Sequence, residues 1–341
     1  MSQIQHLTNH NPSETSSLLP FVQVNNLCMR FVKSRGFIRR KTQVVQAVDN
    51  ISFEISESEI MSVVGESGSG KTTIARCIMA LTIPTSGTIK YKGIDVARLR
   101  GKALLDYRRE VQVIYQDPFE SLIPNRDVFT TLSIPIKRLL KETDRLKIHE
   151  RITALLQEVG LDPLDVIYKF PHQLSGGERQ RINIARALAP NPKLLIADEP
   201  ITMLDASQRL NILSLLMELK VKRNLTILLI THDLASAKLM SDRIVVMYSG
   251  KLMEIGPTNA ILSTPHHPYT ELVLSATPRL RNESQIIEDY SSGIEESENV
   301  ELGCIFRPRC KFATQICKEV EPPLLEKSKS HLAACHNALN L

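Results

Sequence analysis

The most specific pattern in the sequence is a glycine-rich stretch that ends in a lysine and two threonines. We call it the phosphate loop, and it comprises Gly65, Glu66, Ser67, Gly68, Ser69, Gly70, Lys71, Thr72 and Thr73. Glycines permit the tight turn in which backbone amides and a helix N-terminus face phosphate groups. The lysine adds a point charge near the β and γ phosphates, and the first threonine offers a hydroxyl ligand to Mg²⁺. The stretch therefore predicts nucleotide binding, and a plain surface turn is the lesser alternative.

Two adjacent carboxylates follow a second apolar run. Asp198 and Glu199 come directly after the residues Leu194 to Ala197, which read as a buried strand. Ligands gather at the carboxyl ends of such strands in α/β sheets. Asp198 is placed to hold Mg²⁺ through water, and Glu199 points the other way along the pleat to polarise an attacking water as general base. A charge pair at a helix start is the alternative for these two residues alone, and the phosphate loop favours the catalytic interpretation.

A third pattern opens a predicted helix that runs to Leu188. We call it the signature stretch, and it comprises Ser175, Gly176, Gly177 and Glu178. Ser and Glu at this spacing form a capping box, so the stretch could be a helix start only. Two glycines beside a capped N-terminus also leave amides free for an anion. Both interpretations are compatible, and single residues such as Gln116 and His232 say little by themselves.

Composition limits the class of protein. The chain has 341 residues, which suggests about two domains, and 43% hydrophobic with 23% charged residues is typical of a soluble globular protein. The net charge of +5 is too small to indicate nucleic acid as a principal partner. No apolar run approaches the roughly 18 residues of a membrane span. Residues 1–20 are polar and lack the features of a secretion signal, so we expect a disordered N-terminus on a cytosolic chain.

The elements that must position these residues alternate between strands and helices. Apolar runs predict buried strands at 60–64, 111–115, 194–197 and 225–230, and Ser249-Gly250 predicts a hairpin turn. The span between 116 and 194 has mostly helical spacing. We expect an α/β domain over residues 21–280 with a parallel core and an antiparallel extension. An acidic linker at 281–300 and a cysteine-rich C-terminal extension at 301–341 follow.

Together these residues resemble a family, the ATP-binding subunits of ABC transporters, over about residues 21–278. The resemblance rests on the order of the phosphate loop, Gln116, the signature stretch, Asp198-Glu199, the Leu204-Asp205 turn and His232. It implies a P-loop ABC ATPase domain with an antiparallel β subdomain and an inserted helical subdomain at about 117–187. It also implies ATP and Mg²⁺ as ligands, with Thr72, Gln116 and Asp198 at the metal.

The same resemblance implies roles that reach beyond one chain. The signature stretch would bind the γ-phosphate of ATP held by the opposite subunit, His232 would contact that phosphate, and Asp205 would lie across the dimer. Gln116 would sense the transmembrane partner. An aromatic residue before the first core strands would stack on adenine, and Phe31 is the choice, with Phe37 as the alternative.

A narrower resemblance is to the oligopeptide and dipeptide importer branch. It rests on Gln116-Asp117-Pro118, Ser121-Leu122, Pro124 and the His267-Pro268-Tyr269-Thr270 stretch. The branch implies a second ATPase subunit, with a paralogue favoured, two transmembrane permeases and a periplasmic or lipoprotein solute-binding protein. The chain would then lie on the cytoplasmic face of a bacterial inner membrane as a peripheral subunit.

Two departures and several alternatives accompany this resemblance. Glu178 stands where Gln is usual, and Thr202-Met203 replace the common Ser-Ala. The rival class is a soluble ABC-type ATPase in DNA repair or translation, which usually carries two nucleotide domains or a long coiled coil. Dipeptides, oligopeptides, antimicrobial peptides and nickel complexes all stay open as cargo.

Four cysteines crowd the C-terminal extension, namely Cys304, Cys310, Cys317 and Cys335. From the residues alone an iron–sulfur cluster, a zinc site with His331 and His336 as possible substitute ligands, and an unligated tail stay open. The branch resemblance favours a [4Fe–4S] cluster. We expect Arg307 and Arg309, beside Cys310, to favour deprotonated thiols.

Overall fold

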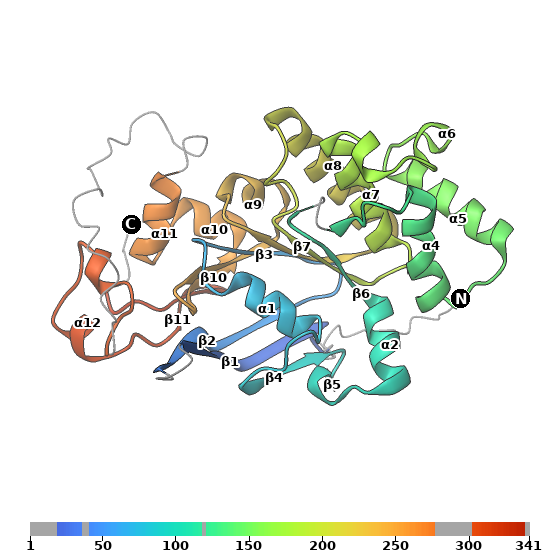
Figure 1. The fold of residues 1–341 in the computed structure, drawn as a ribbon. Coiled ribbons are helices and arrows are strands. Elements are labelled where there is room, and N and C mark those ends of the chain that lie inside the picture. The colour runs from blue at the N-terminus through green and yellow to red at the C-terminus, as the bar shows by residue number, and fades with distance from the viewer. Residues whose placement is uncertain (1–18, 36–40, 118–120, 277–301, 338–341) are drawn as a thin grey trace, which may run out of the picture.

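The computed structural model describes residues 19–35, 41–117, 121–276 and 302–337, and Figure 1 shows their arrangement. Within these residues a small antiparallel sheet has the strand order β2-β1-β4-β5. Its strands are β1 (Val22–Arg35), β2 (Lys41–Ile55), β4 (Ser86–Tyr91) and β5 (Ile94–Asp95). The predicted N-terminal segment before residue 19 and the predicted linker at 281–300 lie outside the described residues.

The large sheet has the order β11-β12-β10-β9-β3-β8-β7-β6 in the described part of the chain. Its parallel strands are β3 (Ile60–Gly65), β6 (Val111–Ile114), β7 (Leu194–Asp198), β8 (Thr226–Thr231) and β9 (Arg243–Tyr248). Three strands continue it in antiparallel pairs, β10 (Lys251–Pro257), β11 (Leu325–Ser328) and β12 (His331–Ala333). The predicted parallel core with an antiparallel extension is thereby confirmed, and so is the hairpin turn at Ser249-Gly250, where both residues have positive φ.

Helices cover the large sheet and fill the span between β6 and β7. They are α1 (Lys71–Ile78), α2 (Gly101–Glu110), α4 (Val128–Leu139), α5 (Arg145–Glu158), α6 (Pro163–Val166), α7 (Gly176–Leu188), α8 (Ala206–Arg223), α9 (Leu234–Met240), α10 (Thr258–Ser263), α11 (Pro268–Ser275) and α12 (Ile316–Glu319). Short 3₁₀ turns are η1 (Val96–Arg98), η2 (Pro171–Gln173) and η4 (Arg307–Arg309). Helices α4 to α7 lie at the opposite end of the molecule from α11 and α12 (Figure 1).

Both faces of the central strands are buried. On β7, Leu194 and Ile196 pack with α1 and the small sheet, whereas Leu195 and Ala197 pack with the helices on the opposite face. Side chains alternate between the faces of a strand, so a strand covered on both sides reads as a continuous apolar run. Polar side chains therefore begin at the carboxyl end of β7, with Asp198 and Glu199.

The C-terminal extension shares its core with the main body. Strand β12 pairs with β10, and Phe306 is 1% exposed in a cluster that also contains Val64 and Tyr269. The described part of the extension therefore has apolar and sheet contacts to residues far away in sequence.

A buried carboxylate joins this extension to the large sheet. Glu254 on β10 is fully buried, and its oxygens accept hydrogen bonds from His331 Nε2 at 2.6 Å and from the backbone N–H groups of His266 at 2.7 Å and His267 at 3.1 Å. A buried charge is tolerated when such partners replace water. Glu254 thus fixes β12 and the start of α11 together.

Among the described helices, none combines the length and the apolar composition that crossing a bilayer requires.

His267 gives this region a predictable response to pH. Its Nδ1 accepts the Tyr269 N–H at 3.0 Å, and burial lowers the pKa of His267 to about 4, opposed by the Glu254 carboxylate and the Ala334 backbone. Between pH 6.5 and 4 the unfolded chain would bind a proton here that the folded chain does not bind. The free energy of unfolding should therefore fall by about 2 kcal/mol between pH 7.5 and pH 5 through this group.

Urea unfolding of the full chain at both pH values measures this effect. The matched variant is His267→Asn, which keeps an acceptor for the Tyr269 N–H but does not titrate. Its loss of stability between the two pH values should be smaller by about the same amount. Equal losses in both proteins would show that His267 is not the responsible group.

Candidate functional site

The phosphate loop connects β3 to α1, and two of its glycines have no room for a side chain. A Cβ on Gly65 would lie 2.2 Å from the Met247 carbonyl oxygen, and one on Gly70 would lie 2.3 Å from the Ala47 carbonyl oxygen. Gly70 also has φ of +100° and immediately precedes α1. Close backbone contacts therefore hold the loop so that the N-terminus of α1 opens into a cleft.

That cleft has a volume of about 650 Å³ and brings together most of the phosphate loop with Gln116, Glu199 and His232. It is lined by Ala47, Gly65, Glu66, Ser67, Gly68, Gly70, Lys71, Thr72, Thr73, Gln116, Glu199, His232 and Val273. Ser69 is buried beside it and accepts a long contact from Lys71 Nζ at 3.4 Å. A Gly-rich loop, a lysine and a helix N-terminus in one cleft can receive a polyphosphate.

Lys71 is held inside the loop. Its ammonium group donates to the carbonyl oxygens of Gly65 and Glu66, both at 2.8 Å, and the residue is only 4% exposed. Burial lowers the pKa of Lys71, whereas the carboxylates of Glu199, Asp198 and Glu66 raise it. The ammonium group is thus fixed by its neighbours at the place where a phosphate needs a positive charge.

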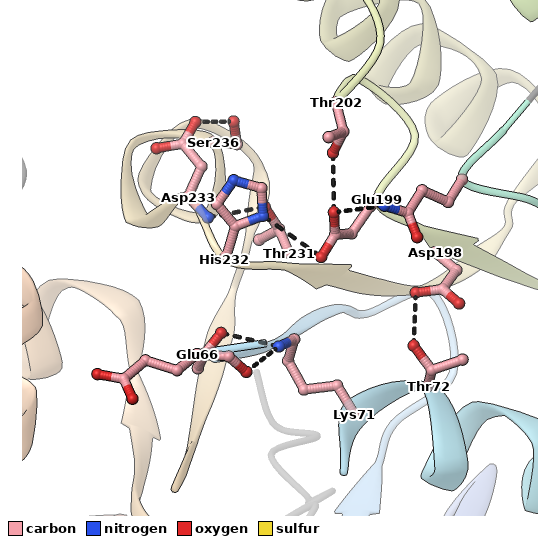
Figure 2. A network of polar contacts seen from close by, with 12 residues as sticks. Glu66, Lys71, Thr72, Asp198, Glu199, Thr202, Thr231, His232, Asp233 and Ser236 are labelled. Carbon is pink, nitrogen blue, oxygen red and sulfur yellow. Dashed lines mark hydrogen bonds and ion pairs between the residues drawn. The ribbon is translucent and has the colours of Figure 1, made fainter. Parts of the chain in front are cut away.

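Asp198 lies beside Thr72, which lines the cleft. Thr72 Oγ1 lies 3.4 Å from Asp198 Oδ1, as Figure 2 shows. Burial raises the pKa of Asp198 and the Glu199 charge adds to this, whereas Thr72 and Lys71 lower it. A hydroxyl and a carboxylate are the hard oxygen ligands that Mg²⁺ prefers, and such an ion would offset the raised pKa.

Glu199 points away from Asp198 and receives three contacts (Figure 2). Its Oε2 accepts from Thr202 Oγ1 at 2.9 Å and from Gln116 Nε2 at 3.2 Å, and its Oε1 lies 3.3 Å from His232 Nδ1. The backbone of Glu199 has φ of +47°, in the left-handed region that non-glycine residues rarely adopt. The three predicted residues Gln116, Glu199 and His232 therefore share one hydrogen-bonded group, in which a carboxylate can orient water.

Thr202 was not expected in this group. The sequence indicates only that Thr202-Met203 replace the Ser-Ala pair that is common in the family. A hydroxyl three residues after a carboxylate at a strand end could have suggested the contact, because a tight turn brings such positions together.

The signature stretch forms a helix start as well as an exposed surface. Ser175 Oγ accepts the Glu178 N–H at 3.3 Å, and Glu178 Oε2 accepts the Ser175 N–H at 2.7 Å, which confirms the capping box. These hydrogen bonds from Ser175 lower the pKa of Glu178. Asp205 caps α8 in the same way by accepting the Gln208 N–H at 2.9 Å.

The signature stretch and the Asp205 turn lie next to each other but outside the cleft. A Cβ on Gly177 would lie 3.1 Å from the Gln208 side chain, which belongs to the first turn of α8. Ser175 and Asp205 are exposed, and neither is among the described residues that line the cleft. Among the described residues of one chain, therefore, the cleft at the phosphate loop is formed without Ser175 and Asp205.

The predicted adenine-stacking residue lies on the small sheet. Phe31 is part of β1 opposite Val45 and is partly buried against the core beneath that sheet. It is absent from the described residues that line the cleft. The alternative, Phe37, lies outside the described residues.

All four cysteines of the extension line one small cavity, which we call the cysteine cavity. Its lining also includes His336, Arg307 and Phe306. Burial raises the pKa values of Cys304, Cys310 and Cys335, that of Cys335 to about 11, and neighbouring cysteines raise each of them further. The arginines therefore do not make these thiols acidic in the way that the sequence suggested.

The four cysteines and their neighbours are not arranged as a metal site in the described structure. Among the described residues, no three His, Cys, Asp or Glu side chains are arranged as a ready metal site. His331 as a substitute zinc ligand was wrong, because its ring is paired with Glu254 and does not line the cysteine cavity. His336 does line it, and its Nε2 lies 2.9 Å from the Val320 carbonyl oxygen.

The two arginines near Cys310 have different contacts. Arg307 donates to the carbonyl oxygens of Leu302 and Lys318, and it opposes the rise that burial causes in the pKa of Cys304. Arg309 turns toward the phosphate loop, where its Nη1 lies 3.0 Å from both carboxylate oxygens of Glu66.

Comparison with known proteins identifies relatives of the whole arrangement. The family profile described as ABC transporter matches residues 48–202, and the profile described as oligopeptide/dipeptide transporter, C-terminal region, matches residues 253–317. The chain is 40% identical to the oligopeptide transport ATP-binding protein AppF of Bacillus subtilis, over 88% of this chain and 92% of that protein. It is also 40% identical to a putative peptide import ATP-binding protein of Brucella ovis, over 86% of this chain and 93% of that protein.

Solved structures show the same fold. One is an ATP-binding cassette in a dimeric post-hydrolysis state with ADP and Pi, and it matches with a TM-score of 0.61 and 28% identity, over 70% of this chain and 98% of that one. Another is cbiO1 from Clostridium perfringens, described as part of the ABC transporter complex cbiONQ. It matches with a TM-score of 0.61 and 24% identity, over 72% of this chain and 91% of that one.

The contact between Thr202 and Glu199 can be tested directly. Thr202→Val keeps the side-chain shape but removes the hydroxyl, so the Glu199 carboxylate loses one of its donors. We expect nucleoside triphosphate hydrolysis to slow by about three- to tenfold, because one hydrogen bond to a charged group contributes about 1 kcal/mol or somewhat more. Nucleotide binding should change little, since the phosphate loop is untouched.

Thr202→Ser is the matched control, because it retains the hydroxyl and should hydrolyse at a rate close to that of the natural chain. Steady-state phosphate release and equilibrium nucleotide binding separate the two effects. If both variants hydrolyse equally well, Thr202 does not position Glu199.

Proposed function

Because the chain belongs to the oligopeptide/dipeptide branch of the ABC transporter family and is the ATP-hydrolysing subunit of a peptide importer, we propose how its residues divide this work. The observation that carries the proposal is the cleft in which the phosphate loop and Glu199 meet, with Asp198 in contact with Thr72 of that loop. Lys71 and the amides of the loop bind the phosphates, and Thr72 with Asp198 holds Mg²⁺, with Gln116 nearby. Glu199 is the general base that accepts a proton from the attacking water.

His232 completes the hydrolytic group in this proposal. Its Nδ1 faces Glu199, so its other ring nitrogen is free to contact the γ-phosphate. Gln116 contacts the same carboxylate and extends from the end of β6, so it can report on the transmembrane partner. Phe31 supplies the ring that stacks on adenine, as the family resemblance implies.

We propose that two such subunits share each ATP. The positions of Ser175 and Asp205 support this, because both residues are exposed and lie outside the cleft at the phosphate loop of their own chain. A second ATP-binding subunit would present its phosphate loop to them, and the family resemblance favours a paralogue as that subunit. One structural relative is itself described as a dimer.

The remaining partners follow from the branch of the family. They are two transmembrane permeases and a solute-binding protein that is periplasmic or a lipoprotein, and they place this subunit peripherally at the cytoplasmic face of a bacterial inner membrane. ATP binding would close the dimer and hydrolysis would reopen it, because the two states differ in affinity for ATP. The transported solute contacts those other subunits, and relatives are named for oligopeptides and peptides.

Domain boundaries are part of the same proposal. Residues 21–280 form the nucleotide-binding domain with its helical subdomain at about 117–187, and residues 301–341 form the cysteine-rich extension. The helices α4 to α7, which lie between β6 and β7, support the helical subdomain.

The assignment of the general base predicts the effect of Glu199→Gln. Hydrolysis should fall by at least about 100-fold, the amount typical of losing a general base, while ATP still binds. A closed, ATP-bound dimer should accumulate. Lys71→Ala is the matched comparison, because it removes charge from the phosphate site and should weaken ATP binding itself.

Phosphate release and ATP binding by the purified transporter complex distinguish these outcomes. Near-normal turnover in the Glu199→Gln complex would remove Glu199 from the proposed role.

We also propose that the four cysteines hold a [4Fe–4S] cluster. The convergence of four thiols on one cavity supports it, and four cysteine ligands match the number such a cluster takes. When bound, the cluster would supply a covalent cross-link between the turn at 304–310, α12 and the residues after β12. Zinc is the alternative, with His336 at the same cavity.

Anaerobically purified protein should then be brown and contain iron and sulfide. Cys310→Ser should bleach the protein and loosen the extension, because one ligand is lost. Cys28→Ser is the control, since Cys28 lies on β1 outside the cysteine cavity, and its colour should persist. Colourless anaerobic protein with one zinc per chain would rule out the cluster.

A further inference from the structure

Glu66, the second residue of the phosphate loop, is held at each of its polar groups. Its carbonyl oxygen accepts from Lys71 inside the loop at 2.8 Å. Its backbone N–H donates to the Tyr269 hydroxyl at 3.1 Å, and its carboxylate pairs with Arg309 at 3.0 Å. Two of these three partners come from the C-terminal part of the chain, more than 200 residues away in sequence.

Tyr269 and Arg309 both pack against the aromatic rings of Tyr248 and Phe306. The Tyr269 side chain is fully buried, and its ring packs against Tyr248 and Phe306 with centroid distances of 4.7 and 5.4 Å. The Arg309 guanidinium lies over the rings of Tyr248 and Phe306, at 5.5 and 5.8 Å from their centroids. Arg309 also immediately precedes Cys310 of the cysteine cavity. Packed rings leave both polar groups little freedom to turn away from the loop.

The charge on Glu66 gives this arrangement a consequence for nucleotide binding. Glu66 lines the cleft that receives the polyphosphate, and two negative groups at close range repel each other. Arg309 neutralises the carboxylate and directs it toward the extension. The pair is only partly buried, with side chains 38% and 47% exposed, so solvent reduces its effect to a few-fold in affinity.

We propose that Arg309 and Tyr269 are positioning residues for the phosphate loop, which makes the C-terminal extension a part of the ATP site. Tyr269 orients the Glu66 peptide, and Arg309 keeps the Glu66 carboxylate from opposing the phosphates. The inference rests on the proposed function, because it assigns these residues to the same ATP-binding cleft.

A coupling experiment on the full-length chain tests the proposal. Arg309→Ala should raise the KM for ATP, and the dissociation constant of a fluorescent ATP analogue, by about three- to tenfold while kcat stays within about twofold. In a Glu66→Gln background the same substitution should change both constants by less than about twofold, because the repelling charge is gone. Arg309→Lys, which keeps the charge, should recover part of the loss.

Tyr269→Phe removes only the hydroxyl that accepts the Glu66 N–H, and it should also raise KM with little change in kcat. Lys329→Ala is the matched control, because it removes one positive charge from the same extension in the turn between β11 and β12, and it should leave both constants unchanged. If Arg309→Ala does not fold, Arg309→Gln in the two backgrounds provides the same comparison.

Two results would overturn the proposal. An unchanged KM in Arg309→Ala would show that the ion pair has no effect on ATP binding. An equal loss with and without the Glu66 carboxylate would show that Arg309 acts on ATP by another route. Neither result concerns hydrolysis by Glu199, so the proposed function stands or falls separately on the Glu199→Gln measurement.

Discussion

The site depends on the common direction and register of three buried strands. In β3, β7 and β8, Val64 lies beside Thr231 and Asp198 lies beside Ile230. The residues that follow these strands therefore leave the core at one edge, where the phosphate loop, Glu199 and His232 meet. Because side chains alternate between two buried faces, a slip of one residue would move each side chain to the opposite face and exchange the directions of Asp198 and Glu199. The same packing that stabilises the sheet therefore fixes the chemistry at its edge.

Strands β11 and β12 of the extension form one edge of the same sheet. Residues near this edge contact the phosphate loop at Glu66. Glu254 attaches β12 and α11 to β10, and the Phe306 ring packs where β9, α11 and the extension converge. From that support Tyr269 and Arg309 reach Glu66. Glu66 in the ATP cleft is consequently held by residues from the last quarter of the chain. The extension thus contacts the nucleotide-binding domain at its phosphate loop.

The sequence patterns predicted features formed by neighbouring residues, but they did not predict contacts between residues far apart in the chain. The phosphate loop and the strand before Asp198 were predictable, because turn geometry and burial leave their mark within a few residues. The hairpin at Ser249-Gly250 was predictable for the same reason. The pairing of Arg309 with Glu66 spans 243 positions, and no periodicity records it. His331 was misjudged because a histidine near cysteines resembles a metal ligand until Glu254, 77 positions away, provides its partner.

The left-handed backbone conformation of Glu199 lowers the stability of the fold but directs a side chain of the proposed site. A residue with a Cβ at this φ costs about 1 kcal/mol or more relative to a glycine, which adopts the conformation freely. The conformation aims the carboxylate at Thr202, Gln116 and His232 rather than back into the sheet. Selection for stability alone would favour glycine or asparagine at this position. With glutamate in this conformation, the domain carries a small loss of stability that comes with the direction of one side chain.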